Sequence, residues 1–456
     1  MERHLTKIVA TVGPACQSEK TIGELIQAGV NIFRFNFKHN TLDWHDRMIQ
    51  KVNRVAMHLG ARVGTLIDLQ GPEIRIKLPK EKILVKKGQI IPFFTITHPQ
   101  LIPLLKTGQK IIVDDGKFKF VFNKKSRNNF LISESDGFVL NKKTLNIPGL
   151  NFPLPVLIDR DFQGLHLAAR NQVDYVALSF VRSADDISIL RREIKKFKLD
   201  TSVIAKIETN MALKNLDKIL TVSDGIMVAR GDLGVEIPLE EVPYQQKIII
   251  KKCILKGIPV ITATQMLESM ITAPIPTRAE ISDIANATYD LTDAVMLSGE
   301  TATGKYPVQA VEIMRKTLIF NEKKNLVDSR LRFNFNVEEE YEFLAEAAYG
   351  LYRSISQKKR TFAGFIVFTT NGQAIRALAR YRPLFPIFAF MSDSRIADQL
   401  AASFGVNAII LQEQNLEKAF AFLKKANYLK KGGDIFIILY PTSQKGTRVL
   451  GISHIN

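Results

Sequence analysis

The chain has 456 residues, 46% of them hydrophobic and 24% charged, which suits two or three globular domains with sizeable cores. Its net charge is +18, but no basic block interleaved with aromatic residues and no zinc-finger pattern accompanies it, so we expect no nucleic-acid partner. With no apolar run of roughly 18 residues, no signal-peptide pattern and only two cysteines, we expect a cytoplasmic protein without a membrane partner.

Eight short apolar runs alternate with longer helical patterns through the first two-thirds of the chain. Each run is mostly continuous in its apolar residues, as expected of parallel strands buried on both faces. A polar or amphipathic helical stretch follows every run except the third. Eight such units predict an α/β fold of the TIM (β/α)8 barrel type. The runs are 7–13, 31–37, 62–69, 173–180, 202–208, 225–230, 259–265 and 294–300.

The segment 73–154, after the third run, has short alternating strands, the turn Asp114-Asp115-Gly116 and no convincing helix. This pattern predicts a small β-barrel domain that is inserted into a barrel loop. Residues 76–152 carry 14 Lys and Arg against 5 Asp and Glu, which reflects either a lysine-rich proteome or a surface that attracts a polyphosphate. The barrel itself would consist of residues 1–72 and 155–335.

A second alternation of helices and strands begins at residue 336 and predicts a C-terminal open α/β domain, residues 336–456. We expect helices at 338–357, 372–380, 394–404 and 416–428, and strands at 363–369, 386–390, 407–411 and 434–440. One loop of this domain follows a strand and opens a helix, which suits a phosphate, although an ordinary turn is the alternative. The loop comprises Thr369, Thr370, Asn371, Gly372 and Gln373, and a second loop, 443–448, would close over it.

Polar side chains collect at the predicted carboxyl ends of the barrel strands, where TIM-barrel chemistry is built. Lys206 and Glu208 share one face of the fifth strand, for which a buried strand has little structural use. Glu208 and Asp232 come from adjacent strands and can converge on Mg²⁺, which proteins bind through one or two carboxylates. With Arg34 and Lys206 beside them, this set favours phosphoryl transfer. The alternative is a buried ion pair that merely closes the barrel.

Long stretches of the chain resemble the pyruvate kinase family. They are KIET, SDGIMVARGDLGVEIP, ITATQMLESM, PTRAEISDIANA and AVMLSGETATGKYP in the barrel, and LTKIVATVGPAC, FRFNFKH and GPEIR near the N-terminus. VDDG and LNIPG resemble the lid of that family. The resemblance covers most of the chain. It implies the last step of glycolysis, in which phosphoenolpyruvate and ADP give pyruvate and ATP with Mg²⁺ or Mn²⁺, and it implies a homotetramer with a sugar-phosphate effector in the C-terminal domain.

The resemblance also implies roles for individual residues. Arg34 would bind the substrate phosphate, and Lys206 would stabilise the phosphoryl group in flight. Thr264 would lie beside the enolate, and the backbone of Gly231 and Asp232 would receive the substrate carboxylate. Glu208 and Asp232 would hold the divalent ion. The residues expected near the nucleotide are Arg75, Asn36, His39 and Lys143. Closure of the lid would exclude water.

The chain departs from the family at its K⁺ site, which usually lies in RLNFSH and LDTKGPEIR. Asn36 and Asp68 remain, but Lys38 replaces the serine and Leu69 replaces the threonine. We hypothesise that the Lys38 ammonium fills this remnant K⁺ site, so that the enzyme needs no K⁺. A unit charge about 4 Å from its partner is worth about 4 kcal/mol at an effective dielectric of about 20. The alternative is that Lys38 points to solvent and the cation site is damaged.

Two other functions remain open at this point. A degenerate relative kept for binding or regulation would explain the altered cation site. A lyase or aldolase on the same kind of barrel would also use Mg²⁺ and Arg34, but it would have no ADP for a lid and Arg75 to cover.

Overall fold

Eight parallel strands close into a barrel in the order β1, β17, β16, β15, β14, β13, β3, β2, which confirms the predicted TIM barrel. The computed structural model describes residues 4–125, 128–150, 154–324, 333–358, 362–429, 434–441 and 448–455. Each of the eight predicted runs contains one barrel strand. The strands are β1 (Lys7–Thr11), β2 (Ile32–Asn36), β3 (Gly64–Asp68), β13 (Tyr175–Leu178), β14 (Ser202–Ile207), β15 (Gly225–Ala229), β16 (Val260–Ala263) and β17 (Ala294–Leu297).

Side chains of the barrel strands alternate between two cores, which explains why the runs are apolar throughout. On β1, Ile8 and Ala10 belong to the core between the strands and the outer helices, whereas Val9 belongs to the core inside the barrel. The outer helices are α1 (Glu19–Ala28), α2 (Leu42–His58), α3 (Asp159–Asn171), α4 (Ala184–Lys196), α5 (Asn210–Lys214), α6 (Leu216–Leu220), α7 (Arg230–Glu236), α8 (Val242–Lys256), α9 (Arg278–Tyr289), α10 (Gly299–Ala302) and α11 (Pro307–Lys324). Short 3-10 helices are η1 (Pro14–Cys16), η3 (Leu239–Glu241) and η4 (Glu268–Ile271).

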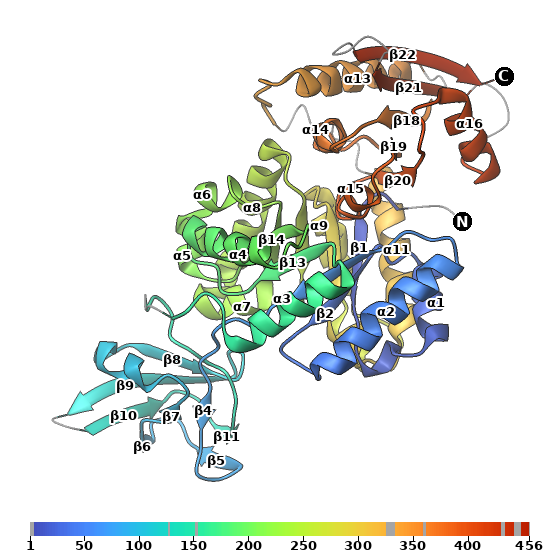
Figure 1. The fold of residues 1–456 in the computed structure, drawn as a ribbon. Helices are drawn as coiled ribbons and strands as arrows, with labels where there is room; N and C mark the ends of the chain where they lie inside the picture. Colours follow the sequence, from blue (N-terminus) through green and yellow to red (C-terminus); the bar gives the residue numbers. More distant parts are fainter. Residues whose placement is uncertain are drawn as a thin grey trace.

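The chain between β3 and α3, here called the inserted segment, forms antiparallel sheets around its own apolar core. One sheet has the order β12, β8, β9, β10, β6, and two pairs are β11 with β5 and β4 with β7. Figure 1 shows that this segment projects from one end of the barrel. Its elements are β4 (Ile76–Lys77), β5 (Lys82–Val85), β6 (Ile90–Pro92), β7 (Thr95–Ile96), η2 (Pro99–Leu104), β8 (Lys110–Val113), β9 (Phe118–Lys125), β10 (Asn128–Ser133), β11 (Gly137–Leu140) and β12 (Leu145–Asn146).

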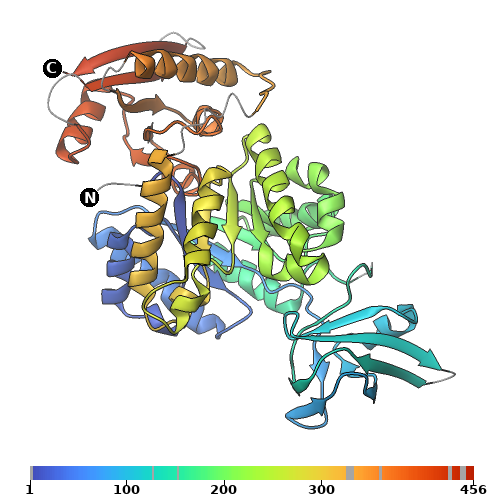
Figure 2. The ribbon, with the colours of Figure 1, turned by 180° about the vertical axis from the view of Figure 1, so that it is seen from behind.

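The C-terminal part is an open α/β sheet in the order β20, β19, β18, β21, β22, and it lies at the opposite end of the barrel from the inserted segment (Figure 2). Strands β20, β19, β18 and β21 are parallel, and β22 is antiparallel to β21. The elements are α13 (Glu340–Gln357), β18 (Phe362–Phe368), α14 (Gln373–Ala379), β19 (Ile387–Met391), α15 (Ser394–Asp398), β20 (Val406–Ile410), α16 (Leu416–Lys425), β21 (Asp434–Pro441) and β22 (Arg448–Ile455). The domain boundaries that we place at residues 72, 154 and 335 stay predictions.

Two details of the C-terminal sheet differ from the sequence prediction. Strand β22 was not predicted, because its apolar residues are interrupted by Gly451 and it lies at the exposed edge of the sheet. The helix predicted at 394–404 ends at Asp398, because the barrel binds the backbone that would continue it. The Tyr175 hydroxyl accepts from the N–H of Ala402 (3.1 Å), and an Asp293 oxygen accepts from the N–H of Phe404 (3.0 Å).

Contacts of the C-terminal part cover the amino ends of the barrel strands. Arg382 and Asp293 form a buried ion pair of 2.6 Å there, and the Lys7 ammonium donates to the Val406 carbonyl at 2.6 Å. This end of the barrel is therefore closed, and the carboxyl ends of the strands, beside the inserted segment, remain for a site. Among the described residues, no helix combines the length and apolar character that crossing a membrane requires.

Candidate active site

Arg34 extends from β2 at the carboxyl end of the barrel and is only 7% exposed. Its Nε and Nη2 bind Asp68 Oδ2 at 2.8 and 2.6 Å, and its Nη1 donates to the Thr11 hydroxyl at 2.9 Å. The β2–β3 register places Asn36 opposite Asp68, so the two strand ends bring these side chains to one level. Arg34 is thus held in one orientation before any ligand binds.

Lys206 on β14 meets the same carboxylate from the other side. Its ammonium lies 3.1 Å from Asp68 Oδ1 and 2.7 Å from Glu208 Oε1, and it donates to Ser179 Oγ at 2.8 Å. Burial lowers the pKa of Lys206, but the carboxylates of Asp68, Glu208 and Asp232 outweigh this effect and hold the pKa above its usual value. Lys206 is therefore a fixed cation.

Asp68 is the centre of this cluster rather than a vacant cation ligand. The cations of Lys206 and Arg34 overcome its burial and lower its pKa, and Ser179 Oγ lies 3.3 Å from its second oxygen. The side-chain oxygens of Asn36 and Asp68, predicted to form a remnant K⁺ site, thus already bind other groups of the protein. Asn36 Oδ1 accepts from the backbone N–H of Lys38 at 3.2 Å.

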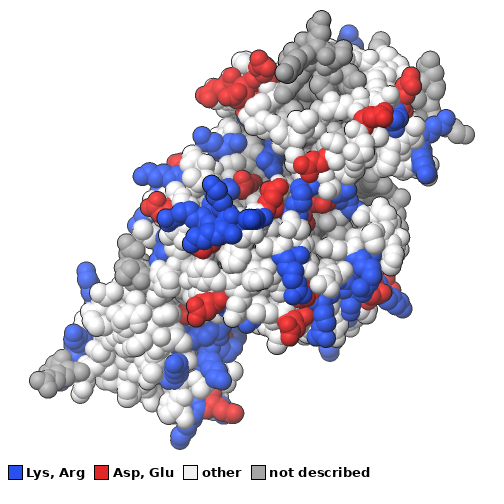
Figure 3. All heavy atoms as spheres, in the orientation of Figure 1, with Lys and Arg blue, Asp and Glu red and all other residues white. Residues whose placement is uncertain are grey.

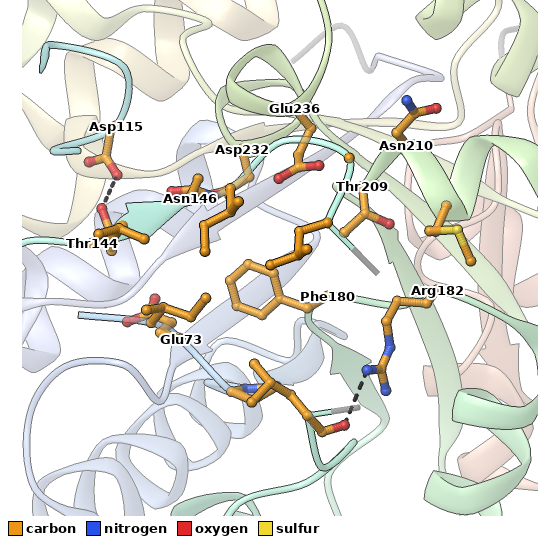
Figure 4. A pocket seen from close by; sticks show the side chains of 18 residues that line it. Glu73, Asp115, Thr144, Asn146, Phe180, Arg182, Thr209, Asn210, Asp232 and Glu236 are labelled. Carbon is orange, nitrogen blue, oxygen red and sulfur yellow. Dashed lines mark hydrogen bonds between the residues drawn. The ribbon is translucent and has the colours of Figure 1, made fainter. Parts of the chain in front are cut away.

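Glu208 directly follows β14, and Asp232 lies in the first turn of α7, after the adjacent strand β15. The two carboxylates differ in how they are bound. Besides its contact with Lys206, Glu208 accepts from the N–H of Phe180 at 2.7 Å, and burial raises its pKa to about 7. Burial also raises the pKa of Asp232, while Lys206 and Lys38 oppose the rise. Across the described ranges, no donor or cation lies within bonding distance of the Asp232 carboxylate, which points toward the cavity in Figure 4.

These two carboxylates fit a divalent ion of the Mg²⁺ type. The described parts of the chain contain no cluster of three or more His, Cys, Asp or Glu with metal-binding geometry. Mg²⁺ does not require one, because one or two carboxylates suffice when water and substrate oxygens fill the other positions. The free carboxylate of Asp232 and the nearby Glu208 supply that donor set.

Gly231 and Thr264 meet at the ends of β15 and β16. The N–H of Gly231 donates to Thr264 Oγ1 at 2.9 Å. Thr264 has φ +68°, a conformation that is costly for a β-branched residue. Arg230 holds it there by donating to its carbonyl at 2.5 Å, and an ion pair of 2.8 Å ties Arg230 to Asp283. The strain places the Thr264 hydroxyl at the rim, as sites of chemistry often require.

Lys38 points to a residue that the sequence analysis missed. Its ammonium lies 2.5 Å from Glu73 Oε1, and Glu73 Oε2 lies 2.5 Å from Arg75 Nη2. Arg75 also donates to the carbonyl of Lys142 at 2.8 Å. The two cations therefore share one carboxylate at the start of the inserted segment. Lys38 therefore binds Glu73 rather than the Asp68 oxygens, and its side chain is only partly exposed. The GPEIR motif, which contains both Glu73 and Arg75, was the available signal.

The remaining nucleotide candidates, His39 and Lys143, are placed differently. Burial and the nearby Lys38 lower the pKa of His39, and Glu73, Arg34 and Arg75 are close enough to act on it. Lys143 lies in the inserted segment, where its ammonium pairs with Asp114 at 2.8 Å. His39 thus belongs to the cluster at the barrel rim, and the role of Lys143 stays a prediction.

The predicted effector loop uses its own backbone donors. Thr369 Oγ1 accepts from the N–H of Asn371 (3.4 Å) and Gly372 (3.0 Å), and Asn371 Oδ1 accepts from the N–H of Gln373 (3.2 Å). Thr370 is exposed. Residues 442–447 of the second loop lie outside the described residues. An effector site here stays a prediction.

A cavity lies between the inserted segment and the barrel (Figure 4). Apolar side chains such as Phe180, Leu145 and Met211 line it, and Asp232 and Glu73 connect it to the charged cluster. Burial raises the pKa of Glu236, which also lines it, to about 7. Neither Phe180 nor Glu236 was predictable, because single residues carry no pattern that reveals a cavity between two distant segments.

Positive charge also gathers far from the buried cluster of Arg34 and Lys206. Figure 3 shows Lys and Arg over the inserted segment and a dense group on the barrel surface at α4. The exposed residues of α4 and its end include Arg192, Lys195, Lys196 and Lys198. An excess of Lys and Arg on the surface therefore does not locate the site. The buried cluster around Asp68 does.

The chain is similar to proteins of one family. Residues 3–311 match a family model described as the pyruvate kinase barrel domain, and residues 354–448 match the pyruvate kinase alpha/beta domain. A protein named pyruvate kinase from Staphylococcus epidermidis is 36% identical over 97% of this chain and 79% of its own length. The corresponding figures are 39%, 88% and 70% for one from Geobacillus stearothermophilus, and 38%, 95% and 94% for one from Thermococcus litoralis.

Proposed function

Since the chain belongs to the pyruvate kinase family of phosphotransferases, we propose that it transfers the phosphoryl group of phosphoenolpyruvate to ADP with Mg²⁺. One observation carries the proposal: Arg34 and Lys206 bind opposite oxygens of the buried Asp68, directly beside Glu208 and Asp232. A structural ion pair needs one cation for one carboxylate. Here two cations share one carboxylate, and the Asp232 carboxylate beside them lines a cavity, as transfer of a charged group requires.

The side chains divide the reaction between them. Arg34 and Lys206, both buried and held by ion pairs, bind the phosphoryl oxygens and offset the charge that spreads over them during transfer. Glu208 and Asp232 would hold Mg²⁺, which neutralises phosphate charge when it is bound. Because Thr264 Oγ1 accepts from Gly231, its own hydroxyl proton is left to point at the enolate. The phosphorus–oxygen bond to the enol breaks, a bond to the ADP β-phosphate forms, and the enolate takes up a proton to give pyruvate.

A coupled assay for pyruvate and ATP, with and without Mg²⁺, tests this function. We expect equal amounts of both products and none without a divalent ion. Asp232→Asn should lower turnover by about 10² to 10³ at subsaturating Mg²⁺, because it removes the unpaired carboxylate. The control is Asp217→Asn, which removes an exposed carboxylate on α6. No pyruvate at any Mg²⁺ or Mn²⁺ concentration would instead favour a degenerate relative with a binding role.

We also propose that this enzyme needs no K⁺, because Lys38 supplies a tethered cation. The ion pair with Glu73 supports this proposal, since it holds the ammonium at the rim, and the Lys38 charge favours the ionised form of Asp232. The position differs from our sequence hypothesis in its partner, which is Glu73 rather than Asn36 and Asp68. The family's serine and threonine ligands are absent, so little remains to bind a diffusible ion.

Turnover in Na⁺, K⁺ and tetramethylammonium chloride tests the cation proposal. The wild type should vary less than about twofold among the three salts. Lys38→Ser should lose activity in tetramethylammonium and recover part of it in K⁺. Lys38→Arg, which keeps the charge, is the matched control and should remain independent of K⁺. Strong activation of the wild type by K⁺ would refute this proposal while leaving the phosphoryl-transfer function intact.

A further inference from the structure

Two short necks connect the inserted segment to the barrel. The departing neck, Leu69–Pro72, follows β3, and the returning neck, Leu154–Ile158, precedes α3. One carboxylate, that of Asp161 in the first turn of α3, binds both. Its Oδ1 accepts from the N–H of Gln70 (2.9 Å) and Gly71 (3.3 Å), and its Oδ2 accepts from the N–H of Ile158 (3.0 Å).

This arrangement exceeds what a helix cap requires. A capping acid at this position needs only the bond to Ile158, which closes the first turn of α3. The bonds to Gln70 and Gly71 reach about 90 positions back along the chain. Asp161 is completely buried, and no cation in the described part of the chain pairs with it. Because an unpaired buried carboxylate is costly, the three N–H donors are what stabilise it there.

The departing neck is also held from the opposite side. Gly71 has φ +68°, and a Cβ at this residue would lie 2.9 Å from a ring carbon of Phe180 and 3.2 Å from Cβ of Ser179. Ser179 binds the Lys206 ammonium, and the Phe180 N–H binds Glu208. The neck therefore lies between Asp161 and the two residues that orient the candidate catalytic lysine and metal ligand.

We propose that Asp161 is a positioning residue that fixes both necks at one point, about which the inserted segment turns as one body when it closes over the substrate. The proposal rests on the proposed function in one respect, namely that closure protects the phosphoryl group from water. When the anchor is lost, both necks loosen together and the cleft closes incompletely. Water then competes with ADP, and phosphoenolpyruvate plus water gives pyruvate and inorganic phosphate.

The first measurement is amide hydrogen exchange of the ligand-free chain in peptides that cover the two necks. Asp161→Asn replaces one carboxylate oxygen by an NH2 group, which opposes the N–H donors of one neck, and it removes the negative charge that strengthens the bonds at the other, so exchange should rise about fivefold or more at both necks. Asp161→Glu keeps an acid that can cap α3 but moves its oxygens, so exchange should rise mainly at Gln70 and Gly71. The control is Asp159→Asn, which removes an exposed acid from the same turn and should change neither neck.

The second measurement is the ratio of pyruvate to ATP formed with saturating ADP. The ratio should be one for the wild type and Asp159→Asn and should exceed one for Asp161→Asn. Faster exchange at Ile158 alone, or at neither neck, would overturn the proposal and leave Asp161 as a helix cap. Faster exchange at both necks with a ratio that stays at one would overturn its link to closure, since both necks would then loosen without letting water in. A wild type without activity would refute the proposed function, and the exchange data would still decide whether one carboxylate holds both necks.

Discussion

The two ends of the barrel use the same ingredients, buried arginine and aspartate, in different ways. At the amino ends of the strands, Asp293 binds Arg382 and also accepts from two backbone N–H groups, while Arg382 donates to the Leu291 carbonyl. At the carboxyl ends, Arg34 and Lys206 share Asp68, and Asp232 is left without a partner among the described residues. Complete pairing identifies a structural junction, and incomplete pairing identifies a site prepared for a charged ligand.

The largest loss of stability should come from breaking the buried ion pair of Arg382 and Asp293. Arg382→Met leaves Asp293 buried without its cation, which should lower the free energy of unfolding by about 3–5 kcal/mol. Chemical denaturation followed by circular dichroism measures this loss. The kcat of the molecules that remain folded should change less than about threefold, and a large selective loss of kcat would contradict the structural role of this end.

A fall in pH should lower the free energy of unfolding through protonation of His45. This residue lies at the carboxyl end of the barrel, beneath the loop that carries Lys38. Its ring is buried and stacked on Phe37 with 4.3 Å between centroids, and its Nε2 lies 2.8 Å from the His39 carbonyl. Its Nδ1 has no hydrogen-bond partner among the residues that the structure describes. Burial therefore lowers the pKa of His45 to about 4.

The sign of the His45 effect follows from that shift. The unfolded chain takes up the proton near pH 6.5 and the folded one only near pH 4, so the stabilisation is full above pH 6.5 and is lost as the pH falls toward 4. The loss should reach about 3 kcal/mol. Thermal unfolding from pH 7 to 4 should show this slope in the wild type and a shallower slope in His45→Gln. Equal slopes would mean that His45 is not buried in its neutral form.

The features of the fold and the site that depend on a local sequence pattern were predictable. The eight barrel strands were predictable because residues such as Ile8, Val9 and Ala10 are apolar on both faces. Strand β22 was not, because an edge strand with Gly451 lacks that pattern. Lys206 and Glu208 were evident from their shared strand face. Glu73 and Asp161 were not, because their partners depend on the turn at Gly71 and on the return of the chain some 90 residues later.

The smallest loss of stability should come from breaking an exposed ion pair at the amino ends of the barrel strands. Arg62 pairs with Asp398 between the barrel and the C-terminal sheet, and both side chains are partly exposed. Solvent screens such pairs, so Arg62→Ala should cost about 0.2–1 kcal/mol. The same denaturation experiment measures this cost. A loss as large as that of Arg382→Met would show that burial is not what separates the two pairs.

Replacing Lys206 with Met tests most directly whether the carboxyl-end charges serve chemistry rather than folding. The barrel should stay folded, because Asp68 keeps Arg34 and Glu208, with its pKa raised to about 7, can take up a proton. Pyruvate formation should fall by about 10² to 10³ or more, whereas the exposed control Lys198→Met should keep full activity. A folded Lys206→Met variant with normal turnover would contradict the account.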